Sequence, residues 1–238
     1  MSSVAPLRLL VHGASGRMGA ALLRLAAADP GLKVVAAVSR GGDAGGAIGL
    51  ASADLAQAPD FDVAIDFSLP EAFGPILALC EARARPLVSG TTGLSEAQRA
   101  ALQAAGERIP VAWASNFSLG VVVLEDLVER AARALPGWQV GIVETHHVHK
   151  QDAPSGTALT LGRAAARGNG AMAGIESLRE GEVVGDHRVE LRGTGETLLL
   201  AHHAADRDIF AAGALEAARR LAHRPAGLHR LADLVLGA

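Results

Sequence analysis

The sequence feature that most constrains the fold is a strand, a glycine turn, a helix and a second strand at the start of the chain. Residues 7–12 (LRLLVH) form a short apolar run typical of a buried strand, and the turn GASGRMG follows it directly. The helix formers AALLRLAAA come next, and residues 33–39 (KVVAAVS) predict the second strand. A unit of this kind places its two strands side by side and parallel, with the helix crossing over the sheet. We therefore expect an α/β domain at the N-terminus.

The alternation of strands and helices continues to about residue 116. The predicted strands are short, apolar and without polar alternation, as expected where helices cover both faces of a sheet. They comprise residues 62–68, 86–90 and 110–115, and the helices between them comprise residues 70–84 and 95–108.

The pattern changes after residue 117 and predicts a second domain. Long helices are expected at residues 119–135 and 155–168, and a strand at residues 138–147. Residues 182–193 and 196–206 alternate apolar and polar side chains, which is typical of antiparallel strands with one exposed or interface face.

Composition excludes several classes of function. The formal net charge is −3, aromatic residues make up 3% and tyrosine is absent, so we expect neither nucleic-acid binding nor base stacking. The N-terminus lacks the features of a signal peptide, and no apolar run reaches the ~20 residues that span a bilayer. Cys80 is the one cysteine and suits a reducing compartment. A cytoplasmic protein without membrane contact is the expectation.

The glycine turn indicates a nucleotide site. Gly13, Gly16 and Gly19 are spaced G-x-x-G-x-x-G, with Ser15 where the common fingerprint has its second glycine. The backbone amides of such a turn and the N-terminus of the following helix bind a pyrophosphate. An ordinary tight turn is the alternative, but the strand before and the helix and strand after favour nucleotide binding.

The end of the second strand bears on cofactor choice. NAD sites commonly have a carboxylate there for the ribose 2′-hydroxyl, whereas this chain has Ser39 and Arg40. Neither of these two residues is a carboxylate that would repel a phosphate, and we expect Arg40, with help from Arg17, to pair with the 2′-phosphate of NADPH. NADH remains possible if the following loop folds back and brings Asp43 to the site. The alternative is that both arginines are solvated surface residues.

The stretch VETHHVHKQDAPSGTAL gathers titratable side chains: His146, His147, His149 and Lys150 lie within five positions. A metal site is one interpretation, but neighbouring side chains of an extended segment point to opposite faces, and Lys150 would repel a cation. We therefore expect no metal. A second alternative is a set of histidines that merely titrates.

An anion site follows these histidines at once. Ser155, Gly156 and Thr157 open a predicted helix, whose first N–H groups and dipole favour a negative charge. A histidine with its pKa near ~6.5 is a suitable general acid near neutral pH. The stretch is therefore best interpreted as proton handlers beside an anion site.

Several motifs together resemble one known family. GASGRMG, DFSLPE, GTTG, NFSLGV and above all ETHHVHKQDAPSGTAL are similar to the motifs of the 4-hydroxy-tetrahydrodipicolinate reductase (dihydrodipicolinate reductase) family, in order from residue 7 to the C-terminus. The resemblance implies a Rossmann-like dinucleotide-binding domain at 1–116, completed by residues 207–238. It also implies an α+β substrate-binding and oligomerisation domain at 117–206, built on an open mixed sheet that packs in a homotetramer.

The resemblance also implies an activity and a set of site residues. Members reduce a cyclic imine that bears two carboxylates with NAD(P)H, in lysine and diaminopimelate biosynthesis. His146 would be the proton donor or acceptor, Lys150 a second proton donor and His147 a substrate contact, while the amides of Gly156 and Thr157 would bind a carboxylate. His149 has no assigned role. The implied cofactor-binding residues are Gly13, Ala14, Ser15, Gly16, Arg17, Met18, Ser39, Arg40, Gly90, Thr91, Thr92, Ala114, Ser115, Asn116 and Phe117.

Two alternatives accompany this interpretation. One is a different NAD(P)-dependent amino-acid dehydrogenase, such as an aspartate dehydrogenase, which would leave the histidines without a purpose. The other is a non-catalytic NADPH-binding regulatory protein, because a fold alone never fixes function. A sensor has no need of two proton donors such as His146 and Lys150. Residue Asp206, which precedes Arg207, departs from the Ser-Arg that the family usually has.

Overall fold

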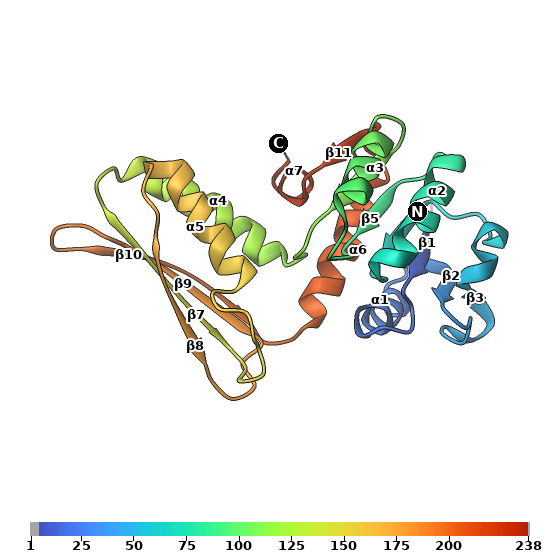
Figure 1. Cartoon of the computed structure of the whole chain (residues 1–238), viewed down its shortest axis with the longest axis horizontal. Helices are drawn as coiled ribbons and strands as arrows, with labels where there is room; N and C mark the ends of the chain where they lie inside the picture. The colour runs from blue at the N-terminus through green and yellow to red at the C-terminus, as the bar shows by residue number, and fades with distance from the viewer. Residues whose placement is uncertain (1–4, 238) are drawn as a thin grey trace. The chain divides into compact units, whose positions relative to one another are not determined.

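The structure, a computed structural model, describes residues 5–237 and divides them into two units. The first unit extends to Phe117 and resumes at Phe210, and the second covers Ser118–Ile209. Figure 1 traces the chain through both. Each unit has its own sheet and its own core, so each is described by itself.

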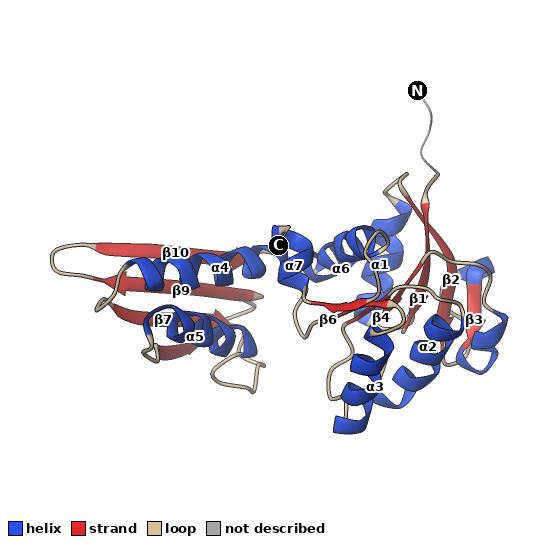
Figure 2. Cartoon of the chain, turned by 90° about the horizontal axis from the view of Figure 1, so that it is seen from above, coloured by secondary structure: helices blue, strands red, loops and turns tan. Residues whose placement is uncertain are grey.

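Within the described residues, the first unit contains a seven-stranded sheet in the order β11-β6-β5-β4-β1-β2-β3, and every neighbouring pair is parallel. Figure 2 shows α1 and α6 on one face of this sheet and α2 and α3 on the other. The strands are β1 Leu7–His12, β2 Leu32–Ser39, β3 Gly49–Ala51, β4 Val63–Asp66, β5 Leu87–Ser89, β6 Pro110–Trp113 and β11 Gly227–His229. The helices are α1 Arg17–Ala27, α2 Pro70–Ala82, α3 Glu96–Gly106, α6 Asp208–Leu221 and α7 Leu231–Leu236, with short 3-10 helices at Gly46–Ile48 and Ser52–Gln57.

The strand order explains why the apolar strands lack alternation. Leu10, Ala64 and Leu87 come from three neighbouring strands and are fully buried in one core, together with Phe73 and Ile76 of α2. The order of the sheet reverses direction between β1 and β4, since β2 and β3 lie on one side of β1 and the later strands on the other. Ligands of open α/β sheets bind at such a point, beyond the carboxyl ends of the strands.

The second unit packs two helices on one face of a four-stranded mixed sheet in the order β10-β9-β7-β8 (Figures 1 and 2). Strands β7 and β8 are parallel, and the other two pairs are antiparallel. The elements are α4 Leu119–Ala134, β7 Gln139–His146, α5 Gly156–Asn169, β8 Gly174–Arg179, β9 Gly185–Arg192 and β10 Thr197–Ala204.

Burial along β9 shows why this sheet is open on one side. His187, Val189 and Leu191 are buried under the helices, whereas Arg188 and Arg192 are exposed on the other face. The alternation of apolar and polar residues predicted this arrangement, and the expected α/β fold with a parallel sheet and a second, mixed sheet is confirmed. Strands β3 and β8 were not predicted from the sequence.

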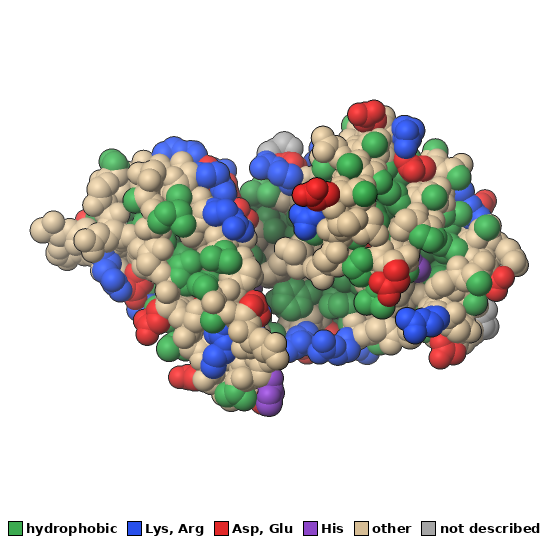
Figure 3. Space-filling view, in the orientation of Figure 1, with side chains coloured by type: hydrophobic (Ala, Val, Ile, Leu, Met, Phe, Trp, Pro, Cys, Tyr) green, Lys and Arg blue, Asp and Glu red, His purple; other side chains and the backbone are tan. Residues whose placement is uncertain are grey.

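The described residues include no helix that is long and apolar enough to cross a membrane. On the face shown in Figure 3, basic and acidic side chains are interspersed, without a large basic patch of the kind that holds a nucleic-acid backbone.

Candidate active site

The glycine turn between β1 and α1 is closely packed. Gly13 has φ +81°, and a Cβ on it would lie 2.4 Å from the Phe67 carbonyl oxygen. A Cβ on Gly19 would lie 2.3 Å from the Gly13 carbonyl oxygen, so α1 packs directly on the turn. Both positions therefore require glycine for steric reasons.

The amides of this turn divide into two groups. Those of Gly13 and Ala14 donate to the Val38 carbonyl at 3.0 and 2.9 Å, and that of Gly16 donates to the Gly13 carbonyl. Gly16 is the N-cap of α1 and makes no side-chain cap, so the first amides of the helix, from Arg17 onward, are those available to an anion. Of the two groups of amides expected at a pyrophosphate, the turn amides of Gly13, Ala14 and Gly16 are used within the protein.

A buried carboxylate joins the carboxyl ends of β1, β4 and β5. Asp66 is fully buried, and its oxygens contact His12 Nδ1 at 2.9 Å, Ser89 Oγ at 2.9 Å and Thr91 Oγ1 at 2.8 Å. Burial alone would raise the pKa of Asp66, but the hydrogen bonds from His12, Ser68 and Thr91 lower it below its usual range. Sequence analysis assigned neither His12 nor Asp66 a role, although polar residues at the ends of apolar strands were the available sign.

The turn after β5, Gly90 to Thr92, depends on this network. Thr91 is buried and bonded to Asp66, and its carbonyl accepts a hydrogen bond from Trp113 Nε1 at 2.9 Å. A Cβ on Gly90 would overlap the Phe67 ring at 2.1 Å. Thr92 is exposed and is the side chain of this turn that faces outward.

The segment after β6 lies beside the same turn. The Ala114 amide donates to the Ser89 carbonyl at 3.2 Å, and the Phe117 ring packs edge-on against Phe67 with centroids 5.5 Å apart. Phe117 is buried, whereas Ser115 is exposed and Asn116 half-buried. The structure thus brings residues 90–92 and 114–117, two segments with implied cofactor-binding residues, to adjoining strand ends.

The loop after β2 folds back on the strand. Ser39 Oγ donates to Asp43 Oδ1 at 2.9 Å and accepts from the Gly42 amide at 3.0 Å, while Arg40 is exposed. Asp43 therefore stands at this strand end, in the folded-back arrangement that was one of the two alternatives for the loop. Gly42, at φ +74°, permits the tight reversal that brings Asp43 back.

The histidines expected to handle protons lie in the second unit, at the end of β7. His146 is the last residue of the strand and is buried, His147 is half-buried, and His149 is exposed. Among residues 5–237, no group of three or more His, Cys, Asp or Glu side chains is arranged to hold a metal ion.

The principal partner of His146 is Glu144, two residues earlier on the same face of β7. Glu144 is fully buried, and its carboxylate contacts His146 Nδ1, the Ser155 amide and the Arg179 guanidinium. Burial alone would raise the pKa of Glu144, but hydrogen bonds from Arg179, Ser177, His146 and Ser155 lower it to about 2. Glu144 and Arg179 were not predicted as site residues, because a carboxylate within a predicted strand is expected to be exposed to solvent.

The pKa of His146 lies below its ordinary value. Burial is the main cause, Lys150 and Arg179 lower it further, and Glu144 opposes them. Lys150 Nζ pairs with Asp152 Oδ1 at 2.7 Å, which lowers the pKa of that carboxyl. The structure thus places one predicted proton handler, His146, at the end of β7 and the other, Lys150, on the loop that follows, each paired with a carboxylate.

The expected anion site is the N-terminus of α5. Ser155 is the N-cap, and its Oγ accepts from the Ala158 amide at 3.1 Å. Gly156 and Thr157 form the first turn of this helix. Because Ser155 is also bonded to Glu144, this helix end is tied to the strand that carries His146.

Arg207 and His187, of the same unit, lie beside His147 and His146. Arg207 Nη2 donates to His147 Nε2 at 3.1 Å, so His147 accepts through that nitrogen. The buried His187 ring lies edge-on to His146 with centroids 5.2 Å apart, and His187 Nε2 contacts Ser155 Oγ at 3.3 Å. Burial, with His146 and His202 nearby, lowers the pKa of His187 to about 4, so it stays neutral near pH 7. Neither Arg207 nor His187 was predicted as a site residue from the sequence.

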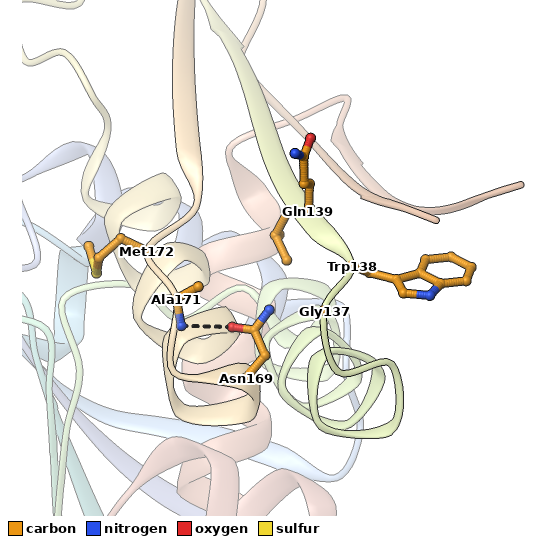
Figure 4. A pocket seen from close by; sticks show the side chains of 7 residues that line it. Gly137, Trp138, Gln139, Asn169, Ala171 and Met172 are labelled. Atoms are coloured by element: carbon orange, nitrogen blue, oxygen red, sulfur yellow. Dashed lines mark hydrogen bonds between the residues drawn. The ribbon is translucent and has the colours of Figure 1, made fainter. Parts of the chain in front are cut away.

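A separate pocket lies at the opposite end of β7. Figure 4 shows it around Trp138, Asn169 and Met172, where Asn169 Oδ1 accepts from the Ala171 amide at 3.0 Å. The eight residues of β7 span roughly 25 Å at ~3.3 Å per residue, so this pocket is far from His146. None of the residues that line it is titratable.

A Rossmann-like unit and a second unit with a mixed sheet are the architecture of nucleotide-dependent oxidoreductases. Comparison with known proteins gives the family. The family models described as dihydrodipicolinate reductase, N-terminus and C-terminus, match residues 7–117 and 120–235. The chain therefore belongs to the 4-hydroxy-tetrahydrodipicolinate reductase family, and the resemblance found in the sequence is confirmed.

Relatives with the same description cover nearly the whole chain. The 4-hydroxy-tetrahydrodipicolinate reductase of Xanthomonas axonopodis pv. citri is 61% identical over 233 residues, which cover 96% of this chain and 98% of the relative. That of Stenotrophomonas maltophilia is 60% identical over 235 residues, covering 97% and 98%. A dipicolinate-bound dihydrodipicolinate reductase from a Paenisporosarcina species has the same fold, with TM-score 0.84 at 21% identity, and covers 94% of this chain and 97% of that one.

Proposed function

We propose the following assignment of roles for the reaction of this family, the NAD(P)H-dependent conversion of 4-hydroxy-tetrahydrodipicolinate to tetrahydrodipicolinate in lysine and diaminopimelate biosynthesis. The substrate carries a hydroxyl that the product lacks, so water leaves, and a hydride and a proton are added. The nicotinamide supplies the hydride, and side chains of this chain handle the protons. One observation carries the assignment: Glu144 holds both His146 and the N-terminus of α5.

His146 and Lys150 are the proton handlers. Glu144 is a carboxylate and only accepts, so His146 keeps a hydrogen on Nδ1 and exchanges its proton with substrate through Nε2. The Lys150 ammonium, held by Asp152, is the second donor. A pair of this kind gives one group for removing a proton and one for delivering it.

The substrate carboxylates bind at positive groups of the same unit. The amides of Gly156 and Thr157 at the start of α5 take one carboxylate, as helix N-termini favour anions. His147 contacts substrate and is oriented by Arg207, whose guanidinium also suits a carboxylate.

The first unit binds the cofactor. Its residues fit a dinucleotide, because the closely packed glycines let a ligand approach the backbone and the N-terminus of α1 favours an anion such as a pyrophosphate. NADPH is preferred, with Arg40 and Arg17 as partners of its 2′-phosphate. NADH is accepted as well, because Asp43 is held where it can receive the ribose hydroxyls.

The open face of the mixed sheet is the basis of a homotetramer. Leu178 and Leu199 are exposed on this face, beside Arg188 and Glu190. Large apolar side chains on an open sheet favour burial against another copy. A cytoplasmic location is part of the same proposal, because buried Cys80 is free.

A coupled assay tests the function. Purified protein is mixed with freshly formed product of dihydrodipicolinate synthase, and oxidation of NADPH or NADH is followed. We expect turnover with both cofactors and higher kcat/KM with NADPH. Absence of turnover with either cofactor would refute the assignment.

A further inference from the structure

The cluster around Glu144 joins parts of the second unit that are far apart in sequence. Arg179, on β8, donates from Nη2 to Oε1 at 3.0 Å and from Nη1 to Oε2 at 3.1 Å. The Ser155 amide donates to Oε1 at 3.1 Å, and His146 Nδ1 contacts Oε2. All of these contacts are made to the carboxylate of Glu144, whose side chain is fully buried.

Arg179 extends this cluster to the loop that carries the lysine. Besides its two bonds to Glu144, its Nε donates to the Lys150 carbonyl at 3.2 Å, and its Nη2 donates to the Asp152 carbonyl. A planar guanidinium makes several bonds in fixed directions, so it sets the loop and the carboxylate relative to each other. Glu144 and Arg179 therefore connect His146, the backbone of Lys150 and the start of α5.

We propose that Glu144 is a positioning residue of this reductase, which fixes the tautomer and the charge balance of His146 and aligns the N-terminus of α5 through Ser155. The proposal rests on the role of His146 in the proposed function. An ionised carboxylate accepts hydrogen bonds but donates none, so the contact places the His146 hydrogen on Nδ1 and leaves Nε2 for exchange.

Charged and titratable groups face His146 from each neighbouring element. Glu144 lies on its own strand, Arg179 on β8, His187 on β9, and Lys150 and Asp152 on the following loop. Glu144 raises the affinity of His146 for a proton, whereas burial, Lys150 and Arg179 lower it. Neutralising Glu144 therefore leaves a buried imidazole beside two cations.

The substitution Glu144→Gln tests the proposal because it keeps the shape and removes the charge. We expect kcat to fall by roughly 10²–10⁴-fold, the range for losing an acid–base group or the carboxylate that sets its tautomer. The limb of the kcat–pH profile that reports His146 should move to lower pH by about 1–3 units. Binding of NADPH should remain as in the original protein.

The matched control is Glu129→Gln in α4 of the same unit. Glu129 also pairs with arginines, Arg133 and Arg167, but contacts no histidine in the described chain. We expect its kcat and pH profile to be unchanged.

The decisive readout is nitrogen-15 NMR of protein labelled in its histidine rings, with His146 assigned by its loss in His146→Asn. The original protein should show His146 with hydrogen on Nδ1, and Glu144→Gln should show a changed tautomer and a lower pKa. Should Glu144→Gln not fold, Glu144→Asp serves instead, since its shortened carboxylate is expected to loosen the tautomer partially.

Each outcome decides the proposal. An unchanged tautomer and pKa of His146 in a folded variant would overturn it, even if turnover were lost, since the role would then be merely structural. If the original protein showed no reductase activity, the proposed function would fail, while the NMR result would still test what Glu144 does to His146.

Discussion

At the scale of single residues, His146 and His149 offer a matched comparison. His146 ends β7 and is buried against Glu144, whereas His149, three residues later, is exposed. We predict that His146→Gln lowers kcat by roughly 10²-fold or more, since it removes the proton-exchanging nitrogen, and that His149→Gln has little effect. Steady-state kinetics with NADPH checks this. Equal losses in the two variants would contradict the assignment.

Lys150 is the second residue whose loss should affect catalysis directly. We predict that Lys150→Ala lowers kcat by roughly 10²-fold or more, because in the proposed mechanism the ammonium delivers a proton. The electrostatic attraction between this ammonium and the reacting groups is also stronger where water is excluded. Fluorescence titration with NADPH should show nearly unchanged affinity. Loss of NADPH binding would mean that Lys150 acts on the cofactor instead.

Cofactor choice also rests on single residues. Arg40 follows Ser39, but Asp43 returns to the same strand end and bonds Ser39. We predict that Arg40→Ala weakens NADPH much more than NADH, whereas Asp43→Asn weakens NADH more. Dissociation constants for both cofactors check this pair. Equal losses for the two cofactors in either variant would count against its assigned contact.

At the scale of elements, the N-cap of α5 should affect substrate binding, while a similar cap elsewhere should not. Ser155 caps α5 and Ser95 caps α3, each through its side-chain oxygen. Replacing either with Ala should cost about 1 kcal/mol of stability. We predict that only Ser155→Ala raises KM for substrate, because the N-terminus of α5 is the proposed carboxylate site. Thermal melts and kinetics separate the two effects, and an equal KM in both variants would refute the anion site.

The sequence predicted those elements that have strong local patterns. Strand β1 and helix α1 follow from an apolar run and a glycine turn, and β9 follows from its alternation. Strand β8 was missed because Gly174–Arg179 is short and half polar, so its place beside β7 depends on tertiary pairing. The role of Glu144 was missed for a similar reason. Its partner Arg179 lies 35 residues away, and no local pattern reports that contact.

At the scale of a whole unit, stability in acid depends on the Glu144 cluster. The pKa of Glu144 in the folded state is about 2, below the ordinary value of 4.5, so folding favours the ionised carboxylate. The contribution of Glu144 to the free energy of unfolding is therefore present above pH ~4.5 and is lost as pH falls toward ~2. We predict that denaturant unfolding shows stability falling across this window, and that Glu144→Gln flattens the fall. Parallel pH dependence in both proteins would contradict the prediction.

At the scale of the whole molecule, the open face of the mixed sheet predicts assembly. Leu199 is 46% exposed on this face, and Leu236 of α7 is 40% exposed in the first unit, so the two are similar in exposure and differ in place. We predict that Leu199→Asp lowers the oligomeric state, because a charge cannot be buried between packed sheets without a partner. Leu236→Asp should leave the tetramer intact. Light scattering after size-exclusion chromatography gives the masses, and a tetramer in Leu199→Asp would place the interface elsewhere.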